Sequence, residues 1–270
     1  MKKFLTQVIK NILPLFILRY LRYIKNSKGF KGVYILWDEA LKNSTGYDKD
    51  IILEKVLIAS LKVKKNEALF ERDSVVFDQC QYSFPLLTSL LYTLVHGKIL
   101  NILDYGGALG SSYFQTKKIL SNTKSLRWNI IEQAHFVLTG KQYFQDEQLF
   151  FYLNIDDCLK QTKPNVVLLS GVLQYLEKPY DFIFELLKKN FDYIIIDRTP
   201  FSKEELITVQ IVPPEIYPAS YPSWIFNQSN LLNCFKEKYS LIYEFDAIDG
   251  AVDRFKNSIH YKGFFLKRRH

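Results

Sequence analysis

The fold of this chain is decided by residues 98–112, KILNILDYGGALGSS. Residues 99–103 are a short run of apolar residues interrupted only by Asn101, a pattern that predicts a buried parallel strand. Asp104 and a glycine cluster follow, and then a helix-like segment over residues 111–120. Glycine lets the backbone approach a ligand closely, and a helix start offers unpaired N–H groups. A strand, a glycine turn and a helix in this order predict a nucleotide-binding corner.

The spacing of the glycines separates two classes of ligand. The dinucleotide fingerprint G-x-G-x-x-G fits Gly107 and Gly110 but places Tyr105 at its first glycine. The pattern acidic-x-G-x-G-x-G is matched, with alanine at its middle glycine, by Asp104, Gly106, Ala108 and Gly110. It is similar to the first motif of class I methyltransferases that use S-adenosylmethionine (SAM), in which the turn packs against the amino-acid end of the cofactor and the acid helps to hold its ammonium group. The alternative is a glycine-rich turn that binds nothing.

A second acid lies at a distance that supports nucleoside binding. Residues 126–132 predict the next strand, which ends on Glu132, 22 residues after Gly110. An acid at the carboxyl end of the second strand is placed to accept hydrogen bonds from both ribose hydroxyls. The alternative for Glu132 is an acid that stabilises the start of the following helix.

The rest of the chain alternates predicted strands and helices. Further strands are expected over residues 149–152, 166–169 and 193–197, and a closing antiparallel pair over residues 239–245 and 263–267. Together the seven strands predict an α/β, doubly wound, Rossmann-like sheet, whose ligands bind outside the carboxyl ends of the strands. Asn154 and Ile155 follow the third strand, where an adenine ring would lie; a helix cap is the alternative there. Ser170 and Gly171 follow the fourth.

Three regions are expected along the chain. Residues 1–29 predict a basic amphipathic arm, and residues 30–97 a helical N-terminal or cap segment. Residues 98–270 form the predicted nucleotide-binding domain, with an insertion at about residues 200–230 that is rich in proline and aromatic residues.

The net charge of +8 is confined to residues 1–31, that is, to the arm and the first residues after it. Residues 1–31 hold eight Lys or Arg and no acid, so the other residues hold 28 Lys or Arg against 28 Asp or Glu. This distribution argues against a nucleic-acid-binding domain. The longest apolar run, residues 12–18, is too short to span a bilayer. The arm is expected either to lie on an anionic membrane surface or to dock on protein.

Cysteine and histidine usage gives two further expectations. The three cysteines lie far apart in the sequence, which favours a reducing, cytoplasmic compartment, with the arm as a peripheral contact at the inner face of the membrane. The four histidines are scattered, and no metal site is expected.

Several segments in combination resemble a known family. ILDYGGALGSSYFQ, LRWNIIEQ, VVLLSGVLQYLEKPY, IIIDRTPF and TVQIVPPEIYPASYPSWIF look like a bacterial family of class I SAM-dependent methyltransferases whose genes lie among those for surface-polysaccharide synthesis. The resemblance covers roughly residues 30–268 and implies methyl transfer from SAM to a saccharide-related or lipid-linked small molecule. The positions expected to bind the cofactor are Asp104, Gly106, Gly107, Ala108, Gly110, Glu132, Gln133, Asn154, Ile155, Ser170 and Gly171.

Candidates for the acceptor side come from the end of the fifth strand and from the insertion. Asp197 is placed to orient or deprotonate a hydroxyl, and Arg198 to hold a phosphate or carboxylate. His260 precedes the last strand and has a suitable ordinary pKa for catalysis. Aromatic side chains for a sugar platform are Tyr217, Tyr221 and Trp224. Structural roles are the alternative for each of these residues.

Two other functions remain open. A nucleotide-sugar or NAD(P)-binding enzyme is disfavoured by Tyr105 in the glycine turn and by the lack of an evident Tyr-x-x-x-Lys pair. A non-catalytic scaffold that binds SAM, or nothing, is the other. Calorimetry with SAM and NAD(P)H separates the first alternative from a methyltransferase, and turnover on an acceptor separates the second.

Overall fold

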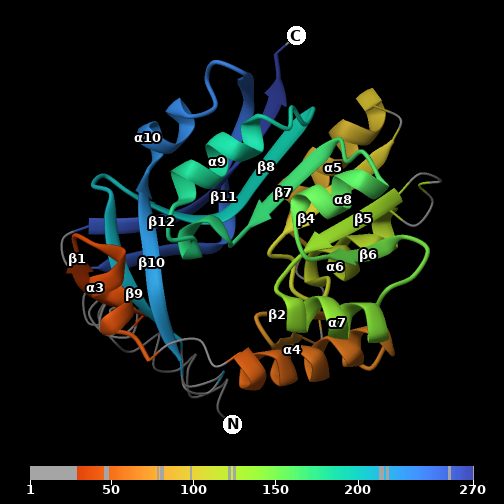
Figure 1. Cartoon of the computed structure of the whole chain (residues 1–270), viewed down its shortest axis with the longest axis horizontal. Helices are drawn as coiled ribbons and strands as arrows, with labels where there is room; N and C mark the ends of the chain where they lie inside the picture. The colour runs from red at the N-terminus through yellow and green to blue at the C-terminus, as the bar shows by residue number, and fades with distance from the viewer. Residues whose placement is uncertain are drawn as a thin grey trace, which may run out of the picture.

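A computed structural model describes residues 29–45, 49–77, 79, 82–97, 99–120, 123, 126–212, 216, 219–254 and 257–269 (Figure 1). The predicted arm up to residue 28 and the predicted site residue Tyr217 lie outside these ranges. Within them, every helix is too short or too polar to cross a bilayer.

Seven strands build the doubly wound sheet that the sequence predicts. They are β4 (Leu100–Tyr105), β5 (Leu126–Ile131), β6 (Leu149–Tyr152), β7 (Val166–Ser170), β8 (Tyr193–Ser202), β11 (Tyr239–Arg254) and β12 (Asn257–Arg268). Their order in space is β6-β5-β4-β7-β8-β12-β11. The five strands from β6 to β8 are parallel, and β12 is antiparallel to both of its neighbours. The predicted Rossmann-like fold class is confirmed.

Helices cover both faces of this sheet (Figure 1). The helices that pack into one hydrophobic cluster are α4 (Lys49–Lys64), α5 (Phe84–Gly97), α6 (Ser111–Leu120) and α7 (Ala134–Tyr143). Those that pack into the other are α8 (Ile155–Gln161), the short 3-10 helix η2 (Leu173–Tyr175), α9 (Pro179–Leu187) and α10 (Gln228–Asn233). Because both faces are covered, the parallel strands are apolar at nearly every position.

Asn101, the one polar residue in the first predicted strand, is satisfied by its neighbours. Its Nδ2 donates to Thr162 Oγ1 (2.7 Å) and to the carbonyl of Lys163 (3.0 Å), and its Oδ1 accepts from Asn129 Nδ2 (2.8 Å). Asn129 is fully buried and also donates to the carbonyl of Ile102. These bonds offset the cost of burying amides in the sheet.

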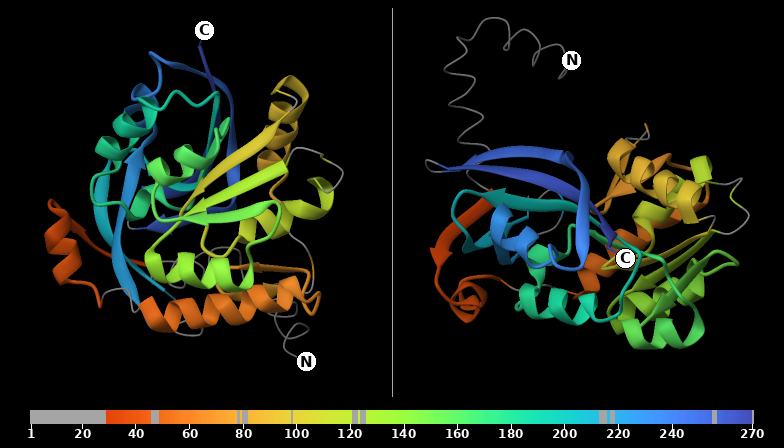
Figure 2. Two further views of the ribbon diagram at one scale, coloured as in Figure 1. Left: turned by 45° about the vertical axis from the view of Figure 1, so that its right-hand side comes forward. Right: turned by 90° about the horizontal axis from the view of Figure 1, so that it is seen from above.

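The predicted insertion extends the main sheet by further strands. Strand β8 continues five residues beyond its predicted end, β9 (Leu206–Ile211) and β10 (Ser220–Asn227) form an antiparallel pair, and the end of β10 pairs in parallel with the end of β8. Strand β1 (Phe30–Tyr34) adds to β9, and α3 (Trp37–Lys42) follows it. Figure 2 shows β11 and β12 as a long curved hairpin beside this extension.

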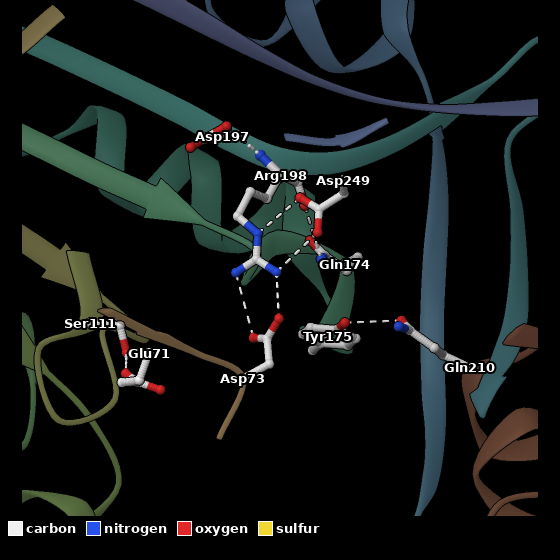
Figure 3. A network of polar contacts seen from close by, with 9 residues as sticks. All are labelled: Glu71, Asp73, Ser111, Gln174, Tyr175, Asp197, Arg198, Gln210 and Asp249. Carbon is white, nitrogen blue, oxygen red and sulfur yellow. Dashed lines mark hydrogen bonds and ion pairs between the residues drawn. The ribbon is translucent and has the colours of Figure 1, made fainter. Parts of the chain in front are cut away.

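A small hairpin within the N-terminal segment is absent from the sequence-based predictions. It consists of β2 (Phe70–Arg72) and β3 (Val75–Phe77). The two residues between the strands, Asp73 and Ser74, have φ values of 52° and 68°, as a two-residue type I′ turn requires. Strand β2 packs against α4 and α6, and the turn reaches Arg198 in the middle of β8 (Figure 3).

Candidate functional site

The glycine turn lies between β4 and α6, at the carboxyl edge of the sheet. Gly106 has φ +74°, and its N–H donates to the carbonyl of Ile131 at 2.9 Å. A Cβ on Gly106 would lie 2.6 Å from a methyl group of Val172. Gly110 has φ +102°. Ala108, the departure from the glycine pattern, also has positive φ, +49°, a conformation that costs an L-residue roughly 1–2 kcal/mol.

Asp104 supports this turn from beneath. Only 1% of its surface is exposed, Trp128 Nε1 donates to its Oδ2 at 2.9 Å, and a Cβ on Gly107 would lie 2.6 Å from its carboxylate. Burial raises the pKa of Asp104 to about 7; the hydrogen bond from Trp128 lowers it, and the charge of Glu132 raises it further. In this structure the Asp104 carboxyl accepts from Trp128 and lies against the turn, which it holds in shape.

Glu132 lies next to the turn, at the end of β5. Its Oε2 accepts a hydrogen bond from the Gln133 N–H at 2.7 Å, and the Ala108 N–H also interacts with its carboxylate. Burial raises the pKa of Glu132, and these two N–H groups lower it. The structure thus joins the two acidic positions of the sequence motif, Asp104 and Glu132, at one edge of the sheet.

The ends of β6 and β7 complete this edge. Asn154 caps α8: its Oδ1 accepts from the Asp157 N–H, and its Nδ2 donates to the Asp157 carboxylate. The capping alternative therefore describes Asn154, and Ile155 begins the helix. Ser170 ends β7, and Gly171, with φ +64°, donates its N–H to the carbonyl of Asp197 at 3.0 Å.

A charged network lies around Arg198, where the sequence predicted the acceptor side of the site (Figure 3). Arg198, in the left-handed conformation at φ +53°, donates through Nε and Nη2 to both oxygens of Asp249, at 2.9 and 3.1 Å. Its Nη2 also donates to Asp73 Oδ2 at 2.7 Å. The side chains of Arg198 and Asp249 are each 22% exposed. The sequence predicted that Arg198 holds an anionic group of the acceptor, but in the structure its guanidinium is already paired with two carboxylates.

Asp197 fixes the backbone at Arg198 and so helps to position the Arg198 side chain. It is 2% exposed, and its Oδ1 accepts from the N–H of Arg198 at 2.8 Å, which fixes the turn of the chain at that residue. Burial raises the pKa of Asp197 to about 6, against the lowering effect of Arg198. Gln174 donates through Nε2 to the carbonyl of Arg198, while its buried Oε1 has no hydrogen-bond partner in the described part of the chain.

His260 does not join this network. It pairs with Phe201 in the ladder between β12 and β8, four residues and roughly 13 Å from Asp197 along the strand. With Lys262 it lines a separate cavity of about 510 Å³ bounded by β8, β10, β12 and the start of α10. The neighbouring Tyr261 lies near the charged network, since burial and then the charges of Tyr175 and Asp249 raise its pKa.

The expected aromatic platform is divided between the two faces of β10. Tyr221 contacts the ring of Tyr175 edge-on at 5.1 Å, and Tyr175 donates to Gln210 Oε1 at 2.9 Å. Trp224, three residues further and so on the opposite face, stacks on Trp37 of α3 at 6.4 Å. Tyr221 is on the side of the network, whereas Trp224 helps to attach α3.

Sequence-based prediction missed the acids that contact the site from outside the parallel strands. Asp73 and Asp249 pair with Arg198, and Glu71 accepts a hydrogen bond from Ser111 Oγ at the start of α6. The segment FERDSVVF around Glu71 alternates about a short polar turn, a hairpin signal. Asp249 has no comparable signal, because its position depends on the length of β11.

Solved structures that are similar to this chain have low sequence identity to it. The N-terminal domain of EvdMO1, solved in the presence of SAH and D-fucose, has 11% identity and a TM-score of 0.45, with 83% of this chain and 98% of that chain covered. The CcbJ methyltransferase from Streptomyces caelestis has 11% identity and a TM-score of 0.45, over 67% of this chain and 94% of that chain. N-methyltransferase NodS from Bradyrhizobium japonicum WM9, in complex with S-adenosyl-L-homocysteine (SAH), has 12% identity and a TM-score of 0.43, over 81% of this chain and 97% of that chain. No protein-family model and no curated sequence matches the chain.

Proposed function

We propose that this protein is a SAM-dependent methyltransferase. The observation that carries the proposal is the junction of the acid–glycine turn with Glu132. The turn follows β4 and Glu132 follows β5, and an N–H of the turn, that of Ala108, interacts with the Glu132 carboxylate. The site lies beside the point between β4 and β7 at which the strand order reverses, where open α/β sheets bind their ligands.

Each part of this edge has a role in holding the cofactor. Glu132 would accept hydrogen bonds from the ribose hydroxyls, and the Gly106–Gly110 turn would pack against the amino-acid end. Leu153, between β6 and α8, is 56% exposed and offers an apolar surface for the adenine ring beside Asn154 and Ile155. Asp104 would act indirectly, by fixing the turn.

Methyl transfer from SAM mainly requires that the acceptor atom and the methyl group are aligned. When bound, SAM supplies a methyl group on a positively charged sulfur. The protein has to align the acceptor with it and exclude water. Asp197, whose pKa burial raises to about 6, is our proposed proton acceptor for an acceptor hydroxyl. Asp197→Asn should lower kcat and leave the Kd for SAH unchanged; a weaker SAH affinity would instead assign Asp197 to the cofactor site.

The acceptor we propose is an uncharged, hydroxylated molecule, saccharide-related or lipid-linked. Arg198 is paired with two carboxylates, so this side offers no free positive charge at that residue for a phosphate. Tyr175, Tyr221 and Gln210 supply ring surfaces and hydrogen-bonding groups suited to a sugar. A screen of neutral and phosphorylated saccharides for methyl transfer tests this choice.

The cofactor assignment is tested by calorimetry on the full chain. SAM or SAH should bind and NAD(P)H should not. Glu132→Ala should weaken SAH binding by about 1–3 kcal/mol, the cost of losing hydrogen bonds to a charged group. Glu147→Ala, at an exposed position just before β6, is the matched control. Binding of NAD(P)H alone would favour a dinucleotide enzyme, and SAH binding with no turnover on any acceptor would favour a scaffold.

For the basic arm we propose attachment to an anionic membrane surface. The proposal is supported by the eight cations and absent acids in residues 1–31, since each basic residue near such a surface contributes about 1 kcal/mol. The full chain should sediment with anionic vesicles at low salt, and a chain that starts at Gly29 should not. If both remain in the supernatant, the arm is a protein-docking segment.

A further inference from the structure

The β2–β3 hairpin places one carboxylate at the glycine turn. In a two-stranded hairpin, neighbouring residues point to opposite faces. Phe70 stacks on Phe77 of β3, and the guanidinium of Arg72 lies over the same ring. Glu71, between them, therefore faces the other way, toward the start of α6. The hydrogen bond from Ser111 Oγ to Glu71 Oε1 confirms this direction (Figure 3).

Glu71 is buried, and among the described residues one of its two carboxylate oxygens lacks a hydrogen bond of normal geometry. It is 2% exposed, and in the described part of the chain no hydrogen bond of normal geometry reaches its Oε2. Burial raises the pKa of Glu71 to about 7; the Ser111 hydroxyl and the backbone N–H of Ser74 lower it, and the charge of Asp73 raises it. A buried, incompletely paired carboxylate is costly. Within the ranges that the structure describes, the contacts to the Ser111 hydroxyl and the Ser74 N–H leave Oε2 without a hydrogen bond of normal geometry, so they do not by themselves explain an acid at this position.

The position of Glu71 indicates what the unpaired oxygen could bind. Ser111 directly follows Gly110, the last glycine of the turn. If Glu132 holds the ribose at the end of β5, the amino-acid end of the cofactor lies further along the turn. Its ammonium group is a cation with three donors, and a carboxylate oxygen is the acceptor that suits it best.

We propose that Glu71 binds the α-ammonium group of the cofactor's amino-acid end. The assignment rests on the proposed function, and it makes the N-terminal hairpin a part of the cofactor site. Glu71 would then bind the amino group of SAM, whereas Glu132 would bind its ribose.

The test is a cycle of two changes, one in the protein and one in the ligand, measured by calorimetry on the full chain. The probes are SAH, the SAH analogue with hydrogen in place of the α-amino group, and 5′-methylthioadenosine, which lacks the whole amino-acid end. Glu71→Gln should weaken SAH binding at least tenfold, about 1.4 kcal/mol, and change the binding of the other two probes less than twofold. Glu67→Gln, on the exposed segment before the hairpin, is the matched control and should leave all three affinities unchanged.

The outcomes separate this assignment from the proposed function. Glutamine has the shape of glutamate and can still accept from Ser111, so far-UV circular dichroism of Glu71→Gln should match the wild type. If the wild type binds none of the probes, the methyltransferase proposal fails and the Glu71 assignment with it. If the wild type binds them and Glu71→Gln weakens all three equally, or none, only the role of Glu71 is overturned.

Discussion

Replacing Asp104 by asparagine should change how the stability of this protein depends on pH. The folded pKa of Asp104 is about 7, against an ordinary value of 3.8, because the carboxyl is buried. Between these values the folded chain keeps a proton that the unfolded chain has lost. The protonated carboxyl thus favours the folded state fully below pH 4, and this contribution is lost as the pH rises toward 7.

The magnitude follows from the linkage relation. One proton of difference changes the free energy of unfolding by about 1.4 kcal/mol per pH unit. From pH 5 to pH 8 the wild type should therefore lose about 2–3 kcal/mol through Asp104, most of it below pH 7. Asparagine cannot titrate, has nearly the same shape, and can still accept the Trp128 hydrogen bond. Relative to the wild type, Asp104→Asn should gain about 2–3 kcal/mol of stability over the same interval.

The assay is urea unfolding of both proteins at pH 5 and pH 8, followed by tryptophan fluorescence. Asp156→Asn, at an exposed position on α8, provides the matched control for removing one negative charge. A stability difference between Asp104→Asn and wild type that is the same at both pH values would refute the description of a buried, protonated carboxyl beneath the turn.

Three further predictions concern the turn, the sheet and the network. Gly106→Ala should destabilise the fold by about 1–3 kcal/mol more than Gly250→Ala in urea unfolding. Both glycines have φ +74°, but of the two only Gly106 has a side chain within 4 Å of the added Cβ. Equal losses of stability would contradict this packing. Asn129→Ala should cost about 3 kcal/mol in the same assay, since it leaves Asn101 Oδ1 without its donor, and a loss below 1 kcal/mol would mean that water replaces the amide. Arg198→Ala should speed amide hydrogen exchange in residues 70–77, which it holds through Asp73, and leave β4 unchanged; slow exchange in that hairpin would show that other contacts hold it.

The amino-acid sequence by itself determined the parallel part of the fold. The apolar runs of β4, β5, β6 and β7 are local signals, because a strand buried on both faces has to be apolar at nearly every position. The step from Gly110 to Glu132 is also local, since it is set by the length of one helix and one strand. The glycine pattern located the turn, and the structure shows why Ala108 stands out there, with its positive φ.

Tertiary structure alone decided how the residues that we propose for the acceptor are arranged. Proline and aromatic residues predicted an insertion at about residues 200–230, whereas pairing with β1 and β8 makes strands of β9 and β10. Strand pairing is a long-range contact, and its gain can outweigh local propensity. The same applies to Arg198: its sequence neighbours suggest an anion site, but Asp73 and Asp249, 125 and 51 residues away in the chain, neutralise it. Charged residues that are brought together only by folding produce no periodic pattern in the sequence. Their pairing therefore could not be predicted from the sequence, and neither could the burial of Glu71 beside the turn.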